Sequence, residues 1–155
     1  MTKKLLIMLV AAATLLLMPV GCRKAPASID GEALYQQMAA LGQFPEMVRF
    51  GDSDIYDYYG IDPAQCKQMV SYVAADGIMT DQFVLVEANE AAYAEEAETL
   101  LKEQIAYRAK TVRDYTPEEY PKISNARIER NGRYVLVLVA EDVDALYRLY
   151  TDALK

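Results

Sequence analysis

The apolar run from Val135 to Val139 restricts the fold of this chain more than any other segment. A strand with one exposed face would alternate apolar and polar residues, whereas a continuous run predicts a central strand covered on both faces. Asn131-Gly132 stands just before Tyr134 and is a strong signal for a tight hairpin turn. We therefore expect strands over Ser124–Arg130 and Tyr134–Ala140, paired as a hairpin.

Two more strands and several helices are predicted from the remaining patterns. Met69–Ala74 and Phe83–Val86 are rich in large or β-branched residues, which favour strands. Helices are expected over 30–41, 52–59, 90–113 and from 143 onward, with a further helical turn after Asp62-Pro63. Their order predicts an α+β fold, a single domain with a mostly antiparallel four-stranded sheet and packed helices.

The expected helices have recognisable caps and inward-facing rows. Residues expected to cap helices or end them are Asp30, Gly42, Asp52 or Ser53, Gly60, Asn89 and Glu141-Asp142. Residues expected on buried stripes are Leu34, Met38 and Leu41; Tyr93, Ala97, Leu101, Ile105 and Ala109; and Val143, Leu146, Tyr147, Tyr150 and Leu154.

The first residues have the layout of a bacterial export signal. Lys3 and Lys4 precede an apolar run from Leu5 to Met18, and Gly21-Cys22 closes it. This order predicts a lipoprotein signal peptide over residues 1–21, a lipidated tether over 22–29 and a domain over 30–155. Acyl chains such as palmitate on Cys22 would then hold the protein to the bilayer, at the extracytoplasmic face of the cell membrane.

Two other interpretations of this leader are weaker. A membrane-spanning helix needs about 20 apolar residues, and the run Leu5–Val20 is shorter and contains Pro19. Secretion with cleavage after Ala27 fits the Ala25-Pro26-Ala27 pattern, but it would leave Arg23 and Lys24 between the apolar run and the cut.

The composition excludes several classes of function. The chain has no histidine, so it cannot form the Ser-His-Asp or Cys-His arrangements of common hydrolases, nor a histidine-based zinc site. Its net charge of −7 makes nucleic acid a poor partner. An acidic cluster at Asp52, Asp54 and Asp57 lacks the spacing of a calcium loop and is explained by helix capping. We expect no catalytic residue, no metal and no cofactor.

The second cysteine, Cys66, has no partner once Cys22 carries lipid, so an internal disulfide is excluded. It falls where the helical turn after Asp62-Pro63 would present an apolar side chain. We therefore expect a buried structural thiol.

Tyrosine is unusually frequent, with 12 residues in the chain. Tyr56, Tyr58 and Tyr59 cluster before Gly60. A tyrosine combines a large apolar ring with a polar hydroxyl, which makes it common at interfaces. Most tyrosines nevertheless pack into cores, so this cluster is a candidate interaction face for an unknown protein or envelope partner.

Four short segments resemble an uncharacterised family of small bacterial lipoproteins known as domain of unknown function 4358. They are Tyr58-Tyr59-Gly60-Ile61-Asp62-Pro63, Asp81-Gln82-Phe83-Val84, Tyr115-Thr116-Pro117-Glu118-Glu119-Tyr120 and Asn131-Gly132-Arg133-Tyr134-Val135. The resemblance implies a cell-surface lipoprotein and transfers no catalytic residue. The sequence as a whole predicts a membrane-anchored, non-enzymatic binding or adaptor domain, with a small cell-envelope hydrolase using Asp or Glu carboxylates as the alternative.

Overall fold

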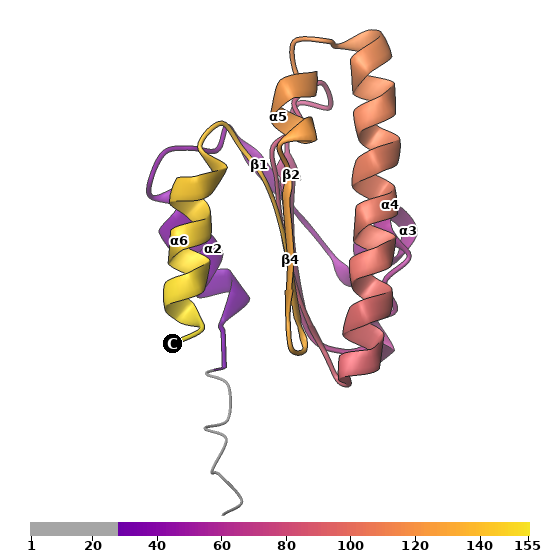
Figure 1. Ribbon diagram of the computed structural model, residues 1–155, viewed down its shortest axis with the longest axis vertical. Helices are drawn as coiled ribbons and strands as arrows, with labels where there is room; N and C mark the ends of the chain where they lie inside the picture. Colours follow the sequence, from indigo (N-terminus) through magenta and orange to yellow (C-terminus); the bar gives the residue numbers. More distant parts are fainter. Residues whose placement is uncertain (1–27) are drawn as a thin grey trace, which may run out of the picture.

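Five antiparallel strands form one sheet in the computed structural model, which describes residues 28–155 (Figure 1). Their order across the sheet is β1-β2-β3-β5-β4. The bounds are β1 Met47–Phe50, β2 Cys66–Ala74, β3 Gln82–Ala88, β4 Arg127–Asn131 and β5 Tyr134–Val139. The predicted signal peptide and Cys22 lie outside the described residues. The α+β class and the antiparallel sheet are confirmed.

The prediction of four strands was wrong, because β1 is a fifth. This strand has four residues and pairs only with β2, from Met47 opposite Ala74 to Phe50 opposite Ser71. It lies at the edge of the sheet, where Val48 is 48% exposed. A short edge strand needs no buried alternating face, so its sequence carries no periodic signal.

Strands β3 and β5 form the centre of the sheet, and the apolar run had predicted this for β5. Every residue of both strands is buried, and they pair from Gln82 opposite Val139 to Glu87 opposite Tyr134. Gly132 turns the β4–β5 hairpin with a φ of 60°. Full burial of one valine or leucine side chain contributes about 1.5–3 kcal/mol, so this pair supplies a large part of the core.

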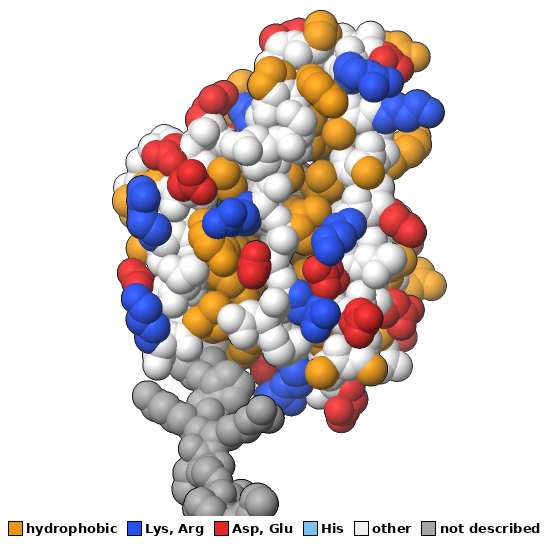
Figure 2. All heavy atoms as spheres, in the orientation of Figure 1, with side chains coloured by type: hydrophobic (Ala, Val, Ile, Leu, Met, Phe, Trp, Pro, Cys, Tyr) orange, Lys and Arg blue, Asp and Glu red, His pale blue; other side chains and the backbone are white. Residues whose placement is uncertain are grey.

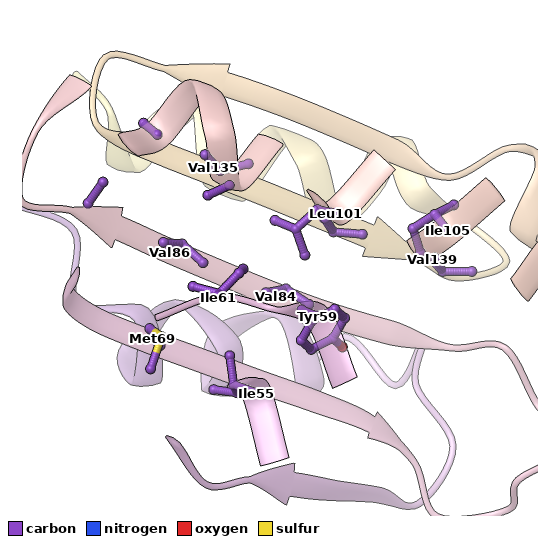
Figure 3. Close-up of a cluster of buried hydrophobic side chains, with 14 of the residues drawn as sticks. Ile55, Tyr59, Ile61, Met69, Val84, Val86, Leu101, Ile105, Val135 and Val139 are labelled. Atoms are coloured by element: carbon purple, nitrogen blue, oxygen red, sulfur yellow. The ribbon is translucent and has the colours of Figure 1, made fainter. Parts of the chain in front are cut away.

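Helices cover both faces of the sheet and make three layers (Figure 1). One face carries α2 (Gly31–Ala39) and α6 (Val143–Ala153), while the other carries α3 (Asp52–Tyr59), α4 (Ala91–Tyr115) and α5 (Tyr120–Ser124). The 3₁₀ turn Pro63–Gln65 leads into β2. Alternate β3 and β5 residues serve the two cores, and Figure 3 shows the core under α4, where Val84 and Val86 face Leu101.

Asp30, Gly60 and Asp142 cap helices as predicted. The caps predicted for two other helices were wrong, because Gly51 rather than Asp52 or Ser53 precedes α3, and Glu90 rather than Asn89 precedes α4.

Asp30 accepts a hydrogen bond from the Ala33 backbone N–H at 3.0 Å, as expected of an N-cap. Helix α2 ends at Ala39, however, so Leu41 lies beyond it and is 48% exposed rather than buried. Helix α5 was not predicted; it has Pro121 in its first turn and includes Ser124, where the strand 124–130 was expected to begin. A helix this short depends on tertiary contacts.

Those contacts centre on Lys122 of α5. Its ammonium group lies 2.8 Å from the Asp81 carboxylate and 3.1 Å from the Glu119 carboxylate. Glu119 also accepts hydrogen bonds from the Thr80 backbone N–H at 2.8 Å and from its hydroxyl at 2.9 Å. Asp81 and Thr80 precede β3 and are fully buried or nearly so. This cluster fixes α5 against the start of the central strand.

From the Lys122 cluster we predict that Glu119 stabilises the fold and that acid weakens this stabilisation. Burial raises the pKa of Glu119, but hydrogen bonds from Thr80 and Lys122 outweigh burial and lower it below its usual 4.5. As the pH falls, Glu119 is therefore protonated in the unfolded state before it is protonated in the folded state. Its contribution to the free energy of unfolding is complete above about pH 4.5 and is lost as the pH falls through the folded-state pKa. We expect Glu119→Gln to reduce the free energy of unfolding near pH 7 by about 1–2 kcal/mol, and by less at low pH.

Denaturant titrations from about pH 7 down to about pH 3 measure this difference. Glu118→Gln is the matched control, because Glu118 is the exposed neighbour of Glu119. Equal pH dependence of the two variants would contradict the role given to Glu119.

Candidate functional site

An open groove of about 500 Å³ lies between α3, α4 and the loop that joins β2 to β3. We call it the tyrosine groove. Helix α4 supplies one wall, since residues 104, 108, 111 and 115 follow one another on the same flank of the helix. Its residues are Asp57, Tyr58, Gly77, Ile78, Gln104, Tyr107, Arg108, Thr111, Val112, Tyr115 and Thr116.

Arg108 joins the three walls of the groove. One guanidinium nitrogen donates to the Tyr58 hydroxyl at 2.8 Å, and another donates to the Met79 carbonyl at 2.5 Å. The Tyr58 ring also meets Phe50 and Tyr59 edge-on, at centroid distances of 5.5 and 4.9 Å. Tyr58 is therefore held in one orientation before any partner arrives, which reduces the entropy lost on binding.

The loop between β2 and β3 brings apolar side chains to the groove. The Asp76 carboxylate accepts a hydrogen bond from the Ile78 backbone N–H at 2.9 Å, and the Asp76 carbonyl accepts one from Met79 at 3.2 Å. This turn holds Ile78 outward, where more than half of its side chain is exposed. An apolar side chain displayed by an ordered turn is available for contact with another molecule.

Two tyrosines at the rim of the groove are the most exposed tyrosines of the described chain. Tyr107 is 74% exposed and Tyr115 is 82% exposed, and both belong to α4. Core packing explains neither ring. Together with Tyr58 and Ile78 they form a patch of aromatic and aliphatic surface around one arginine, a composition typical of binding sites. These side chains can make apolar contacts and hydrogen bonds with another molecule.

The structure divides the predicted tyrosine cluster. Tyr56 is 54% exposed on the outer side of α3, and Tyr58 lines the groove. The prediction that Tyr59 belongs to an interaction face was wrong, because its side chain is only 3% exposed. Its hydroxyl lies 3.2 Å from the Ser71 hydroxyl and also accepts a hydrogen bond from Gln82. Burial raises the pKa of Tyr59 to about 12.

Cys66 is half-buried and opens β2, rather than lying in the preceding helical turn. Burial, with some help from Asp62 and Asp52, raises the pKa of its thiol to about 11. A thiolate is the nucleophilic form of cysteine, and with this pKa the thiol stays protonated near neutral pH. The full burial predicted for Cys66 was wrong, because the side chain is only half-buried.

The acidic cluster around α3 does not converge. Asp54 accepts a hydrogen bond from the Gly51 backbone N–H at 2.8 Å, which closes the helix start. Among residues 28–155, no three acidic or cysteine side chains gather as a possible set of metal ligands. Within the same residues, no helix combines the length and the apolar character needed to cross a bilayer.

Tyr107 and Ile78 were not singled out from the sequence. Tyr107 lies off the predicted buried row of the long helix, and Ile78 follows a loop glycine, so neither belongs to a recognised motif. They meet Tyr58 only because α3, α4 and the loop between β2 and β3 pack together. The excess of tyrosine was the one signal available.

Segments of the chain that carry the family resemblance meet in the interior. Tyr59 from the first segment contacts Gln82 from the second, and Glu119 from the third contacts Thr80 beside the second. The first and third segments also supply Tyr58 and Tyr115 to the tyrosine groove. They therefore serve both the packing of α3 and α5 and the exposed surface.

Comparison with known proteins gives one match. No curated protein and no solved structure matches the sequence. The model of one protein family matches residues 40–140, which span the strands, α3, α4 and α5. The chain belongs to this family, which is described as Domain of unknown function (DUF4358).

Proposed function

We propose that this protein is a membrane-tethered, non-enzymatic binding domain that holds a protein or a cell-envelope component in its tyrosine groove. The observation that carries the proposal is the exposed aromatic surface of Tyr58, Tyr107 and Tyr115 around Arg108. Such a surface offers large rigid rings with hydroxyl groups, which bind at a small loss of side-chain entropy.

The arrangement of the chain supports an outward-facing groove. The described chain begins at Ser28, beside the end of α6, whereas α4 ends at Tyr115 at the opposite end of the molecule (Figure 1). A lipid on Cys22, six positions before Ser28 in the sequence, would place the Ser28 end nearest the membrane. The groove along the second half of α4 would then face the surroundings of the cell.

The buried carboxylates favour binding over hydrolysis. Burial raises the pKa of Glu87, but hydrogen bonds from Lys67 and Gln68 outweigh burial and lower it, and the pKa of Glu119 is lowered in the same way. Asp81 is paired with Lys122. A general acid built from a carboxyl group needs a raised pKa near the working pH, whereas the pKa values of Glu87 and Glu119 are lowered. We therefore do not adopt the alternative of a small hydrolase.

The tether is tested at its attachment point. We expect Cys22→Ala to move the protein from the membrane fraction to the soluble or secreted fraction, because the acyl chains would supply the membrane affinity. Metabolic labelling with a clickable fatty acid should mark the wild type and not the variant. Cys66→Ala is the matched control and should keep both label and membrane association. A labelled Cys22→Ala protein, or one that stays with the membrane, would exclude lipidation at this position as the anchor.

The tyrosine groove is tested by crosslinking in intact cells. We expect a photoreactive phenylalanine analogue at position 107 or 115 to form a discrete adduct, since both side chains stand at the rim of the groove. The same analogue at position 56 serves as the comparison, because Tyr56 is also more than half exposed but does not line the groove. Circular dichroism checks that each variant is folded.

The crosslinked product separates the two faces. An adduct from positions 107 and 115 that Tyr58→Ala weakens would support the groove. An adduct from position 56 alone would place the interaction on the outer side of α3 and contradict the proposal.

A further inference from the structure

A second groove, of about 390 Å³, lies on the other flank of α4, between this helix, α5 and the edge strand β4. In α4 it uses residues 102, 106, 109 and 113, whereas the tyrosine groove uses 104, 108, 111 and 115. Helical spacing places these two rows on different sides of the helix. We call the second groove the basic groove. It shares no residue with the site proposed above.

The floor of the basic groove is apolar. Ile105 and Ile123 belong to the core, and Ala109, Ala126 and Ile128 pack against that core from the groove side. Figure 2 shows hydrophobic side chains in the hollow between α4 and β4, with basic side chains beside it. Apolar surface that remains open between three ordered elements is available to bury a partner's apolar side chains.

The rim of the basic groove carries one sign of charge. Lys102, Lys110 and Arg113 line it, and no acidic residue does. Lys102 is paired with Glu98 at 2.6 Å, and Arg113 reaches Asp114 only at 3.4 Å, with both side chains more than half exposed. Lys110 forms no ion pair within residues 28–155. The chain as a whole has a net charge of −7, so this local excess of cations favours an anionic partner.

The third wall of the groove is the outer edge of the sheet. β4 pairs with β5 on one side and stands last in the strand order, so its other side has no strand beside it in the described part of the chain. β4 lies in front of the sheet in Figure 1, with α4 next to it. An edge strand presents backbone N–H and C=O groups that an extended peptide can pair with.

We propose that the basic groove binds an extended segment of a partner protein. Every second side chain of a strand faces the same way, and the positions of this segment that face α4 would carry both apolar and acidic residues. The segment would add to β4 as a sixth strand. Its apolar side chains would lie on Ile128 and Ala109, and its carboxylates would meet Lys110 and Arg113. The free backbone edge selects a peptide over a lipid, because an acyl chain cannot use those hydrogen-bonding groups.

A synthetic peptide tests this occupant. Fluorescence anisotropy of a labelled peptide that repeats Val-Thr-Glu-Thr, which places Val and Glu on the same face of a strand, should show saturable binding to the purified full chain that weakens with added salt. The same peptide with Lys in place of Glu should bind at least about tenfold more weakly. N-methylation of the peptide backbone on alternate residues should also weaken binding, because it removes the N–H groups that β4 would accept.

Matched variants locate the site. Lys110→Glu with Arg113→Glu should weaken binding of the acidic peptide at least about tenfold. Arg148→Glu should leave it unchanged, because Arg148 is an exposed arginine of α6 on the other face of the sheet. Ala106→Glu is a second test that protects the fold. Ala106 is exposed, and the new carboxylate would lie four residues from both Lys102 and Lys110. We expect Ala106→Glu to weaken binding of the acidic peptide, because the new carboxylate would compete with the peptide for these lysines.

Three results would overturn the proposal. They are equal binding of the acidic and basic peptides, unchanged binding by the double variant, and equal binding of the N-methylated peptide. The last of these would show that β4 does not receive the segment as a strand.

Discussion

The buried pair of β3 and β5 is the constraint on which the rest of this structure depends. Both strands are covered on both faces, so the chain must place helices on each side of the sheet. The segment between β3 and β4 supplies α4 and α5 to one face, while α2 and α6 cover the other. Without both layers, a continuous apolar strand would face water, and the hydrophobic contribution of the core would be lost.

Helix α4 carries the functional surface because of how it meets this sheet. Its inner row, with Ala97, Leu101 and Ile105, packs on the central strands. The two flanks of the helix then form walls with different neighbours. On one side α3 and the loop between β2 and β3 complete an aromatic groove, and on the other α5 and β4 complete a basic one. One helix thus separates two surfaces of different chemistry.

Buried charge in this protein stabilises the arrangement of elements. Lys122 brings together Asp81 before β3 and Glu119 before α5, and Lys67 pairs with Glu87 at the other end of β3. Burying a carboxylate without such a partner would cost on the order of several kcal/mol in desolvation free energy. These ion pairs hold short elements such as α5 against the sheet.

The sequence by itself determined the class of the fold, the β4–β5 hairpin and most helices, because their signals are local. Asn131-Gly132 and Val135–Val139 specify a turn and a fully covered strand, and Asp30 and Gly60 cap or end helices at the expected places. Only the tertiary structure decided β1 and α5, which have no periodic pattern and form through contacts with β2 and with the Lys122 cluster. It also buried Tyr59 and joined Tyr58, Ile78 and Tyr107 in one groove. Burial and contact between residues far apart in the chain depend on how elements pack, and that packing has no local signature in the sequence.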